Sequence, residues 1–298
     1  MEMSEYERAK YKDKVSLEEI ENPVGSKKWD GSHFVLFIQP NGSTKWISRR
    51  ESVKGGYPDR TEKLPHLSDI KLPQYAGNVY SLELIHTGHN TGPDSIESHP
   101  AVSGILNSLA PKAIETQKVT GPIRAVLLDV KRPTLNTYGE KIEHLKEIER
   151  AFGNSSLLFA PDIKIGLDEI SKLIKSTKER GEEGVIVTSL TTPESDNYRV
   201  KIKFINTYNL RVGNILQEFD ISGKPKESMG AMELIDGSGK MVGKVGTGFS
   251  REQRIEIWKN KDAWSGKKLV QVKAMDPTAH KLRSARYNGV ADGNIDTL

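Results

Sequence analysis

The hydrophobic pattern of this chain changes near Asn206, and this change most limits the folds that the chain can adopt. Before it, strand-like runs alternate with apolar residues at helical spacing. After it, short strands follow one another through glycine turns, and a single helix is predicted over residues 250–259, with Ser250 as its N-cap. The pattern therefore predicts an α+β protein of two domains, residues 1–206 and 207–298.

The first part of the chain carries both strand and helix signals. Two apolar runs, residues 33–39 and 44–49, flank a Pro-Asn-Gly-Ser turn, which predicts a β-hairpin. A further strand is predicted at residues 79–85, and apolar residues recur at helical spacing in residues 142–152 and 167–174. We therefore expect hairpin strands combined with helices.

The second part is small, strand-rich and mildly basic. From Asn206 onward, 15 Lys and Arg stand against 11 Asp and Glu, which accounts for the whole net charge of +4. A small strand-rich module with one helix is typical of an OB-fold barrel. Its basic excess favours a polyanionic partner such as nucleic acid, although a solubilising surface charge explains it equally well.

Composition excludes several classes of protein. The 298 residues include no cysteine, so a disulfide framework and cysteine-ligated zinc are excluded. No apolar run approaches the ~20 residues of a membrane span, and the charged first residues lack the apolar core of a secretory signal. We expect a cytoplasmic protein that acts as a monomer and does not bind membranes.

A Lys-x-Asp-Gly pattern precedes the predicted hairpin. It consists of Lys28, Asp30 and Gly31 and follows a second lysine, Lys27. A lysine acts as a nucleophile only when it is deprotonated, so a catalytic lysine needs neighbouring cations, a metal ion or burial. The alternative is a solvated lysine ahead of a turn, because so short a pattern often arises by chance.

Charged residues on two predicted strands are candidates for the same site. Glu83 lies on the strand face opposite Leu82 and Leu84, as a site carboxylate requires. Lys201 and Lys203 share one face of another strand and suit the binding of phosphate. The alternative for these two lysines is the polar face of an amphipathic edge strand.

Three histidines, His86, His89 and His99, lie close together in the sequence in a predicted polar loop. Their spacing fits no metal-ligand motif, so we interpret them as ordinary loop residues.

The order of the motifs resembles that of the covalent nucleotidyltransferases. The matching motifs are Lys28-x-Asp30-Gly31, Ser48-Arg49, Glu83-Leu84, Glu183-Gly184-Val185 and Lys201-x-Lys203. Within that superfamily, residues 243–250 and the tail Leu282-Arg283-Ser284-Ala285-Arg286-Tyr287 resemble the C-terminal OB domain of ATP-dependent DNA ligases. The resemblance runs from about Asn22 to the end. It implies an adenylation domain of antiparallel sheets with flanking helices, followed by a small OB-fold barrel.

The resemblance implies a reaction in which Lys28 attacks the α-phosphate of ATP and forms a lysyl-AMP. The AMP then passes to the 5′-phosphate at a nick in double-stranded DNA, and the 3′-hydroxyl displaces it. ATP is consumed, and Mg²⁺ or Mn²⁺ is required. Such chemistry depends on positioning and on charge neutralisation, which lysines, arginines and a metal ion supply.

The resemblance also implies a role for each motif residue. Glu83 would contact the ribose and the metal ion, Glu183 would bind the metal ion, and Leu128 would cover the adenine. Lys201 and Lys203 would contact the α-phosphate, and Asp30 with Gly31 would shape the loop that carries Lys28. The residues implied in DNA binding are His33, Arg49, Arg50, Arg283 and Arg286.

Several positions depart from the family pattern. The family has arginine at the position of His33, an aromatic residue at Leu128 and lysine at Thr188. Its final R-x-D-K motif reads Ala291-Asp292-Gly293-Asn294 here. Because these differences remove cationic and stacking contacts, we expect a slow self-adenylation step.

Other activities are weighed against the DNA ligase. An NAD-dependent ligase is disfavoured, because those enzymes resemble this chain less: they carry a long N-terminal region before the lysine and a cysteine zinc module. An RNA ligase or another lysyl-nucleotidyltransferase shares the early motifs, but residues 243–250 fit it less well. A third possibility is a non-catalytic nucleic-acid-binding relic of a ligase, which the survival of five motifs argues against.

Overall fold

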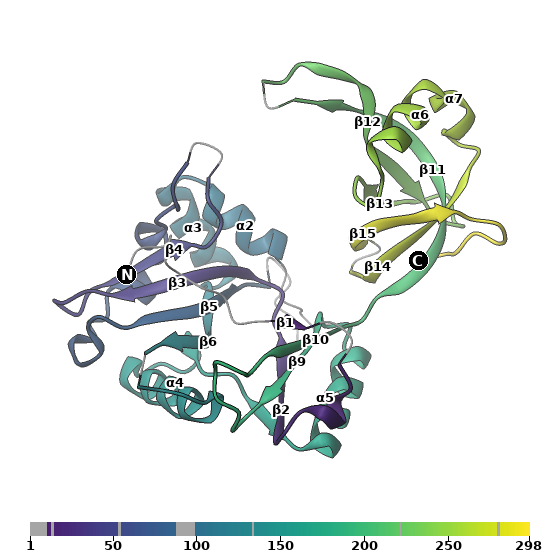
Figure 1. Cartoon of the computed structure of the whole chain (residues 1–298). Helices are drawn as coiled ribbons and strands as arrows, with labels where there is room; N and C mark the ends of the chain where they lie inside the picture. The colour runs from purple at the N-terminus through teal and green to yellow at the C-terminus, as the bar shows by residue number, and fades with distance from the viewer. Residues whose placement is uncertain are drawn as a thin grey trace. The chain divides into compact units, whose positions relative to one another are not determined.

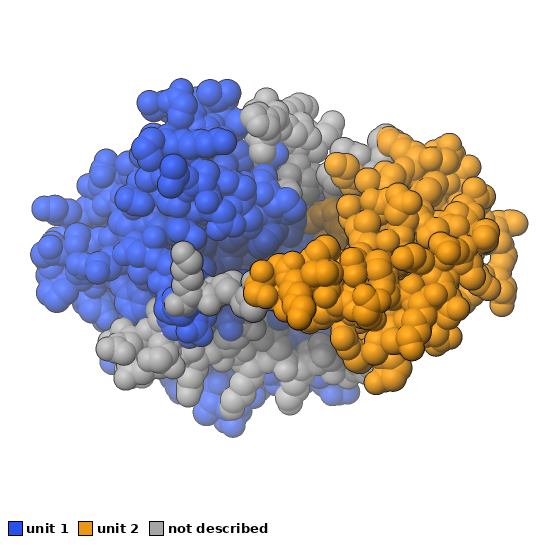
Figure 2. Space-filling model, turned by 90° about the horizontal axis from the view of Figure 1, so that it is seen from above, with its two compact units in different colours: residues 1–202 blue, residues 203–298 orange. Residues whose placement is uncertain are grey.

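The chain forms two compact units in the computed structural model, residues 1–202 and 203–298 (Figure 1, Figure 2). The structure describes residues 11–12, 15–52, 55–87, 99–132, 134–220, 222–278 and 281–298. The α+β class and the antiparallel sheets predicted from the sequence are confirmed. Independent folding of two domains, at residues 1–206 and 207–298, stays a prediction.

The first sheet of unit 1 contains the predicted hairpin. Its strand order is β4-β3-β5-β6-β7, and all neighbours are antiparallel except β6 and β7. The strands are β3 (Ser32–Ile38), β4 (Thr44–Ser48), β5 (Val79–Ile85), β6 (Arg124–Lys131) and β7 (Leu158–Phe159). Helix α4 (Tyr138–Phe152) packs on β6 and β7, and its apolar face joins buried Leu36, Leu82 and Leu127 in the main core of the unit.

The second sheet of unit 1 carries the lysine motif. Its strand order is β1-β10-β9-β2-β8, and β2 pairs antiparallel with both β8 and β9. The strands are β1 (Tyr11–Lys12), β2 (Pro23–Lys28), β8 (Ile163–Ile165), β9 (Gly184–Ser189) and β10 (Arg199–Lys203). Helix α5 (Leu167–Glu179) covers β2 and β9, where Ile170 packs on Val185 and Val187 (Figure 1).

Shorter helices complete unit 1. They are η2 (Leu17–Glu19), η3 (Thr61–Lys63), α1 (Pro65–Ser68), η4 (Pro73–Tyr75), α2 (His99–Asn107) and α3 (Ala110–Thr120). Neither α2 nor α3 is predicted from the sequence. In α3 the apolar periodicity is weak, because the buried residues are Ala113, Gln117 and Thr120 and Val119 is 73% exposed. In α2 the helical period is present but short, with Val102, Ile105 and Leu106 buried. Along the described ranges, every helix is too short or too polar to cross a membrane.

Unit 2 is one curled five-stranded sheet with order β13-β12-β11-β14-β15. The strands are β11 (Asn206–Phe219), β12 (Pro225–Ile235), β13 (Met241–Val245), β14 (Leu269–Thr278) and β15 (Lys281–Val290), and the helices are α6 (Arg251–Lys259) and α7 (Lys261–Trp264). The two edges approach each other, because the Tyr287 N–H of β15 donates to the Thr247 carbonyl just after β13 (2.9 Å). No ladder between described strands closes the sheet completely, as in a partly open OB-fold.

The predicted helix of unit 2 is confirmed at its N-cap. The Ser250 hydroxyl accepts from the Gln253 N–H (3.2 Å), and the Gln253 side chain accepts from the Ser250 N–H (2.8 Å). This reciprocal pair satisfies two backbone donors that the first turn of a helix leaves open.

Candidate active site

Both sheets of unit 1 line one cavity of ≈150 Å³. Its walls consist of Ser26, Lys27, Lys28, Trp29, His33, Ser81, Glu83, Leu128, Asp129, Tyr138, Ile186, Arg199 and Lys201. A cavity of about this volume admits a benzene-sized ring. Strands that are far apart in the sequence therefore bring several predicted site residues together.

Lys28 meets Glu183 through strand register. Lys28 ends β2 opposite Gly184, the first residue of β9. Glu183 precedes Gly184, and its carboxylate forms an ion pair with the Lys28 amine, with side chains 8% and 20% exposed, respectively. An ammonium group is not nucleophilic, so this ion pair must open and the proton must leave before Lys28 can react.

The neighbouring lysine is held differently. Lys27 forms an ion pair with Glu182 (2.8 Å), and its amine lies 4.0 Å from the centre of the Trp29 ring. Trp29 in turn makes an edge-to-face contact with Phe159. The two adjacent lysines therefore have separate carboxylate partners, Glu182 for Lys27 and Glu183 of the Glu-Gly motif for Lys28.

Gly31 and Asp30 fit the loop that follows Lys28. A Cβ atom on Gly31 would lie 2.1 Å from the Leu84 carbonyl oxygen, so only glycine allows β3 to approach β5 this closely. The Gly31 N–H also donates to the Glu83 carboxylate. Asp30 accepts from the backbone N–H of His99 (3.4 Å), at the start of α2.

Glu83 occupies the β5 wall of the cavity. Burial raises its pKa to about 8, Lys28 opposes this shift, and the negative charge of Glu183 adds to it. Like charges close together make one carboxylate retain its proton. Glu83 is therefore close enough to Lys28 and Glu183 to feel their charges, whereas Lys28 and Glu183 form an ion pair with each other.

A β-bulge in β6 turns two successive side chains into the cavity. Ser81 pairs with Asp129, but Leu82 pairs with Leu127, so Leu128 is the extra residue on β6. Successive residues of a regular strand point to opposite faces, and a bulge relaxes this alternation. Leu128 and Asp129 consequently both line the cavity.

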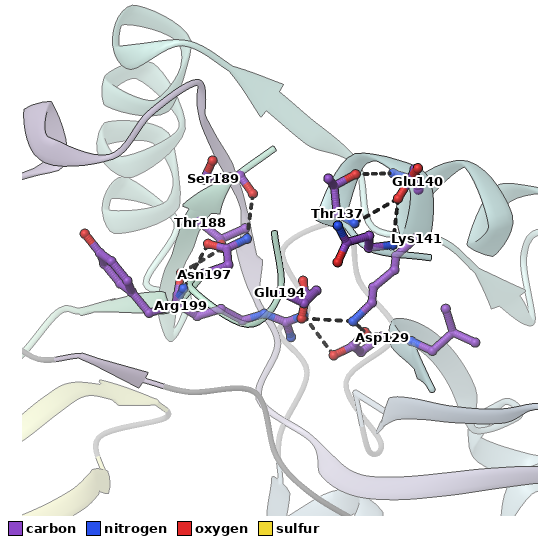
Figure 3. A network of polar contacts seen from close by, with 12 residues as sticks. Asp129, Thr137, Glu140, Lys141, Thr188, Ser189, Glu194, Asn197 and Arg199 are labelled. Atoms are coloured by element: carbon purple, nitrogen blue, oxygen red, sulfur yellow. Dashed lines mark hydrogen bonds and ion pairs between the residues drawn. The ribbon is translucent and has the colours of Figure 1, made fainter. Parts of the chain in front are cut away.

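Asp129 belongs to a polar network that joins the two sheets (Figure 3). Its carboxylate forms ion pairs with Lys141 of α4 and Arg199 of β10, each at 3.0 Å. Lys141 also pairs with Glu194 (2.9 Å). Burial disfavours ionisation of Asp129, but the charges of Arg199 and Lys141 outweigh it and hold the pKa of this carboxyl below its ordinary value.

The two lysines of β10 differ in position. Lys201 lines the cavity. Lys203, two residues further along the strand, is exposed and lies outside the lining. The structure thus brings Lys201, but not Lys203, to the candidate site in unit 1.

The three predicted DNA-binding residues of unit 1 lie around the hairpin of β3 and β4. His33 lines the cavity, and its Nε2 atom is 2.9 Å from the Ser81 hydroxyl. The Arg49 N–H donates to the His33 carbonyl (3.2 Å), which places Arg49 at the same end of the sheet. Arg50 is exposed, and neither arginine belongs to the cavity lining.

Arg283 and Arg286 lie on β15 of unit 2, opposite Met275 and Lys273 of β14. Arg286 is exposed and Arg283 is half-buried. Both belong to a different unit from the cavity, and their role in binding DNA stays a prediction.

The cavity residues could supply only some of the ligands of a metal ion, and a substrate would have to supply others. Among the described residues, no group of three or more His, Cys, Asp and Glu side chains could hold a metal ion. Glu83 and Glu183 supply two carboxylates in one place. Mg²⁺ is commonly bound by one or two carboxylates, with waters and substrate phosphates as the remaining ligands. The interpretation of His86, His89 and His99 as ordinary loop residues is not tested, because His89 lies outside the described residues.

Sequence reasoning missed Asp129, Tyr138 and Arg199, which also line the cavity. A signal for Arg199 was present, because it shares the strand face of Lys201. A charged residue inside the apolar run that ends at Val130 was the signal for Asp129. The bulge that turns Asp129 inward leaves no mark in the sequence.

Neither the family models nor the curated protein sequences compared with this chain match it. Solved structures do. A structure described as that of a Lig E DNA ligase aligns with a TM-score of 0.63 over 96% of this chain and 100% of the other, at 15% identity. The chain has the DNA ligase fold. The α+β adenylation unit and OB-fold unit predicted from the motifs are therefore confirmed as a fold.

A second structure with the ligase fold, described as Pmar-Lig PreS3, aligns with a TM-score of 0.61 over 91% of this chain at 17% identity. The chain spans 64% of the length of that protein. The ATP-dependent DNA ligase from bacteriophage T7, solved with ATP, aligns with a TM-score of 0.47 at 15% identity over 95% of this chain and 98% of that one.

Proposed function

We propose that this protein is an ATP-dependent DNA ligase that seals nicks through a lysyl-AMP intermediate on Lys28. One observation carries the proposal: Lys28, Glu83 and Lys201 meet in a single cavity, with Glu183 paired to Lys28. An amine in a partly enclosed site, carboxylates and a further cation are the groups that nucleotidyl transfer requires.

The first step joins Lys28 to AMP. The deprotonated Nζ of Lys28 attacks the α-phosphorus of ATP, an N–P bond forms, and the bond to the pyrophosphate breaks. Lys201 also lines the cavity, and its charge would neutralise charge on the α-phosphate. The AMP then passes to the 5′-phosphate of a nick, and the 3′-hydroxyl displaces it. Lys203 lies outside the cavity lining, so it would contact the α-phosphate of ATP only from outside the cavity.

The base and sugar of ATP fit the remaining walls. Leu128 of the first sheet and Ile186 of the second both line the cavity, and their apolar side chains can cover the two faces of a purine by dispersion. Glu83, on the neighbouring strand, would form a hydrogen bond with the ribose. Leu128 replaces the aromatic residue of the family pattern, so stacking is absent from this face.

Mg²⁺ or Mn²⁺ would be held by Glu183 and Glu83. When bound, such an ion neutralises phosphate charge as a Lewis acid. The ion pair between Glu183 and Lys28 supports this assignment, because it puts the Glu183 carboxylate beside the amine proposed to react.

Nicked double-stranded DNA is the proposed partner, and a role in DNA repair and replication follows from sealing. Arg49, Arg50 and His33 would contact the 5′-phosphate strand near the cavity, and Arg283 with Arg286 would contact phosphates from unit 2.

A sealing assay tests the proposal. The protein is incubated with ATP, Mg²⁺ and a duplex that carries a single nick with a labelled 5′-phosphate. We expect a joined strand and a transient adenylated strand. Binding of the nicked duplex without either product would support the non-catalytic relic, and joining confined to nicks with RNA strands would support the RNA ligase.

A further inference from the structure

We propose that Asp129 is a specificity-determining residue of the nucleotide site, whose carboxylate accepts a hydrogen bond from the 6-amino group of adenine. The inference rests on the proposed function, because it assigns the base-reading side chain of the same cavity. No motif of the sequence analysis includes Asp129.

The position of Asp129 along the sheet matches the far edge of a base. Ser81 of β5 is its cross-strand neighbour, and Glu83 lies two residues further along β5. Two strand residues span about 7 Å. If Glu83 contacts the ribose, this offset along the sheet puts Asp129 at the edge of the purine that is farthest from the ribose. Leu128 precedes Asp129 in the bulge, so one short segment supplies both an apolar face and a polar edge.

The Asp129 carboxylate keeps acceptor capacity for a ligand. Three donors in the described part of the chain reach it: Lys141 and the Val130 N–H bind Oδ1, and Arg199 binds Oδ2. An ionised carboxylate offers about four acceptor positions, so one remains at Oδ2. The side chain is 14% exposed and lines the cavity.

The network gives this carboxylate a defined charge and orientation. Arg199 and Lys141 hold it from β10 and α4, and the Arg199 guanidinium lies 5.1 Å from the centre of the Tyr138 ring. An ionised carboxylate only accepts hydrogen bonds. It therefore favours the 6-amino group of adenine and repels the 6-oxo group of hypoxanthine or guanine.

Glu194 provides a matched control within the same network. It pairs with Lys141, which it shares with Asp129, but it does not line the cavity. A purely structural network predicts similar effects of Asp129→Asn and Glu194→Gln on every nucleotide. A base-reading role predicts that only Asp129→Asn changes the preference among nucleotides.

The test measures single-turnover formation of the protein–nucleotide adduct by intact mass spectrometry. The probes are ATP, ITP, which carries a 6-oxo group, and purine riboside triphosphate, which lacks the 6-substituent. Wild type should prefer ATP to both analogues by about 10- to 100-fold, the range expected for one hydrogen bond to a charged group. Asp129→Asn should lower the ATP-to-ITP ratio at least about 10-fold, and Glu194→Gln should leave it unchanged.

Three results would overturn the inference: an unchanged ratio in folded Asp129→Asn, an equal change in Glu194→Gln, or a collapse of the ratio in Ser26→Ala alone, which would assign the reading to Ser26. If Asp129→Asn fails to fold because Lys141 loses its counter-charge, the double variant Asp129→Asn/Lys141→Met gives the same comparison. Wild-type protein that forms no adduct with any probe contradicts the proposed function itself, and the inference with it.

Discussion

Glu182 and Glu183 are adjacent glutamates with different partners, and this difference makes a prediction at the scale of single residues. Glu183 pairs with Lys28, whereas Glu182 pairs with Lys27 and with Arg180 (3.0 Å). Because a metal carboxylate stabilises charge in the transition state, Glu183→Ala should reduce nick sealing by about 10²-fold or more. Nick binding should stay near wild type, as measured by gel shift.

Glu182→Ala is the matched control and should seal within a few-fold of wild type. Equal sealing by the two variants would show that Glu183 pairs with Lys28 without taking part in the reaction.

Glu83 makes a pH-dependent prediction. Its folded-state pKa of about 8 lies above the ordinary value of 4.5, so the folded state binds the extra proton. Its contribution to stability is full below pH 4.5 and is lost as the pH rises through 8. Glu83→Gln cannot ionise, so the free energy of unfolding of this variant should improve relative to wild type between pH 5 and pH 9.

Urea unfolding at pH 5, 7 and 9 measures this difference. Glu115→Gln, at an exposed position of α3, is the control and should follow wild type at every pH. A Glu83→Gln difference that does not change with pH would mean that Glu83 ionises normally.

At the scale of elements, the junction between β2 and β3 depends on Gly31. A side chain there meets the Leu84 backbone oxygen, which a rotamer change cannot move. Gly31→Ala should lower the free energy of unfolding by about 1–3 kcal/mol. It should also displace Lys28 from Glu83. Formation of the lysyl-AMP adduct should therefore fall by more than the loss of folded protein explains.

Gly104 of α2 is the contrasting position. A Cβ atom there meets nothing within 4 Å. Gly104→Ala should therefore be neutral or stabilise the protein by up to about 1 kcal/mol, because alanine is the better helix former. Thermal unfolding of both variants distinguishes the two outcomes, and equal melting temperatures would contradict the close approach at Gly31.

Helices and strands whose apolar residues recur with a clear period were predictable from the sequence. Elements that depend on tertiary packing were not. The hairpin of β3 and β4, helices α4 and α5, and the Ser250 cap all follow from local patterns. Helix α3 shows little apolar periodicity, because two of its buried residues are polar, and the helical period of α2 is limited to Val102, Ile105 and Leu106. The candidate site divides in the same way. The Lys-x-Asp-Gly pattern selected Lys28 and the family resemblance selected Glu183, but only strand register and a bulge reveal Asp129 as part of the site.

At the scale of the whole molecule, the short connection between β10 and β11 should separate the two units. Lys203 is exposed and Ile205 is 54% exposed there. Each unit has its own apolar core. Limited trypsin digestion should therefore cut after Lys203 and leave two stable fragments. First cuts inside β11 or β12 would contradict separate folding of the units.

The most direct test of the account asks which lysine carries the nucleotide. The protein is incubated with α-labelled ATP and Mg²⁺ and is resolved by denaturing electrophoresis. Because Lys28 is paired with Glu183 and lies close to Glu83, whereas Lys27 is held by Glu182 and Trp29, Lys28→Ala should abolish the covalent label and Lys27→Ala should retain most of it. Label that persists on Lys28→Ala, or that disappears from Lys27→Ala while Lys28 is intact, would contradict the central claim.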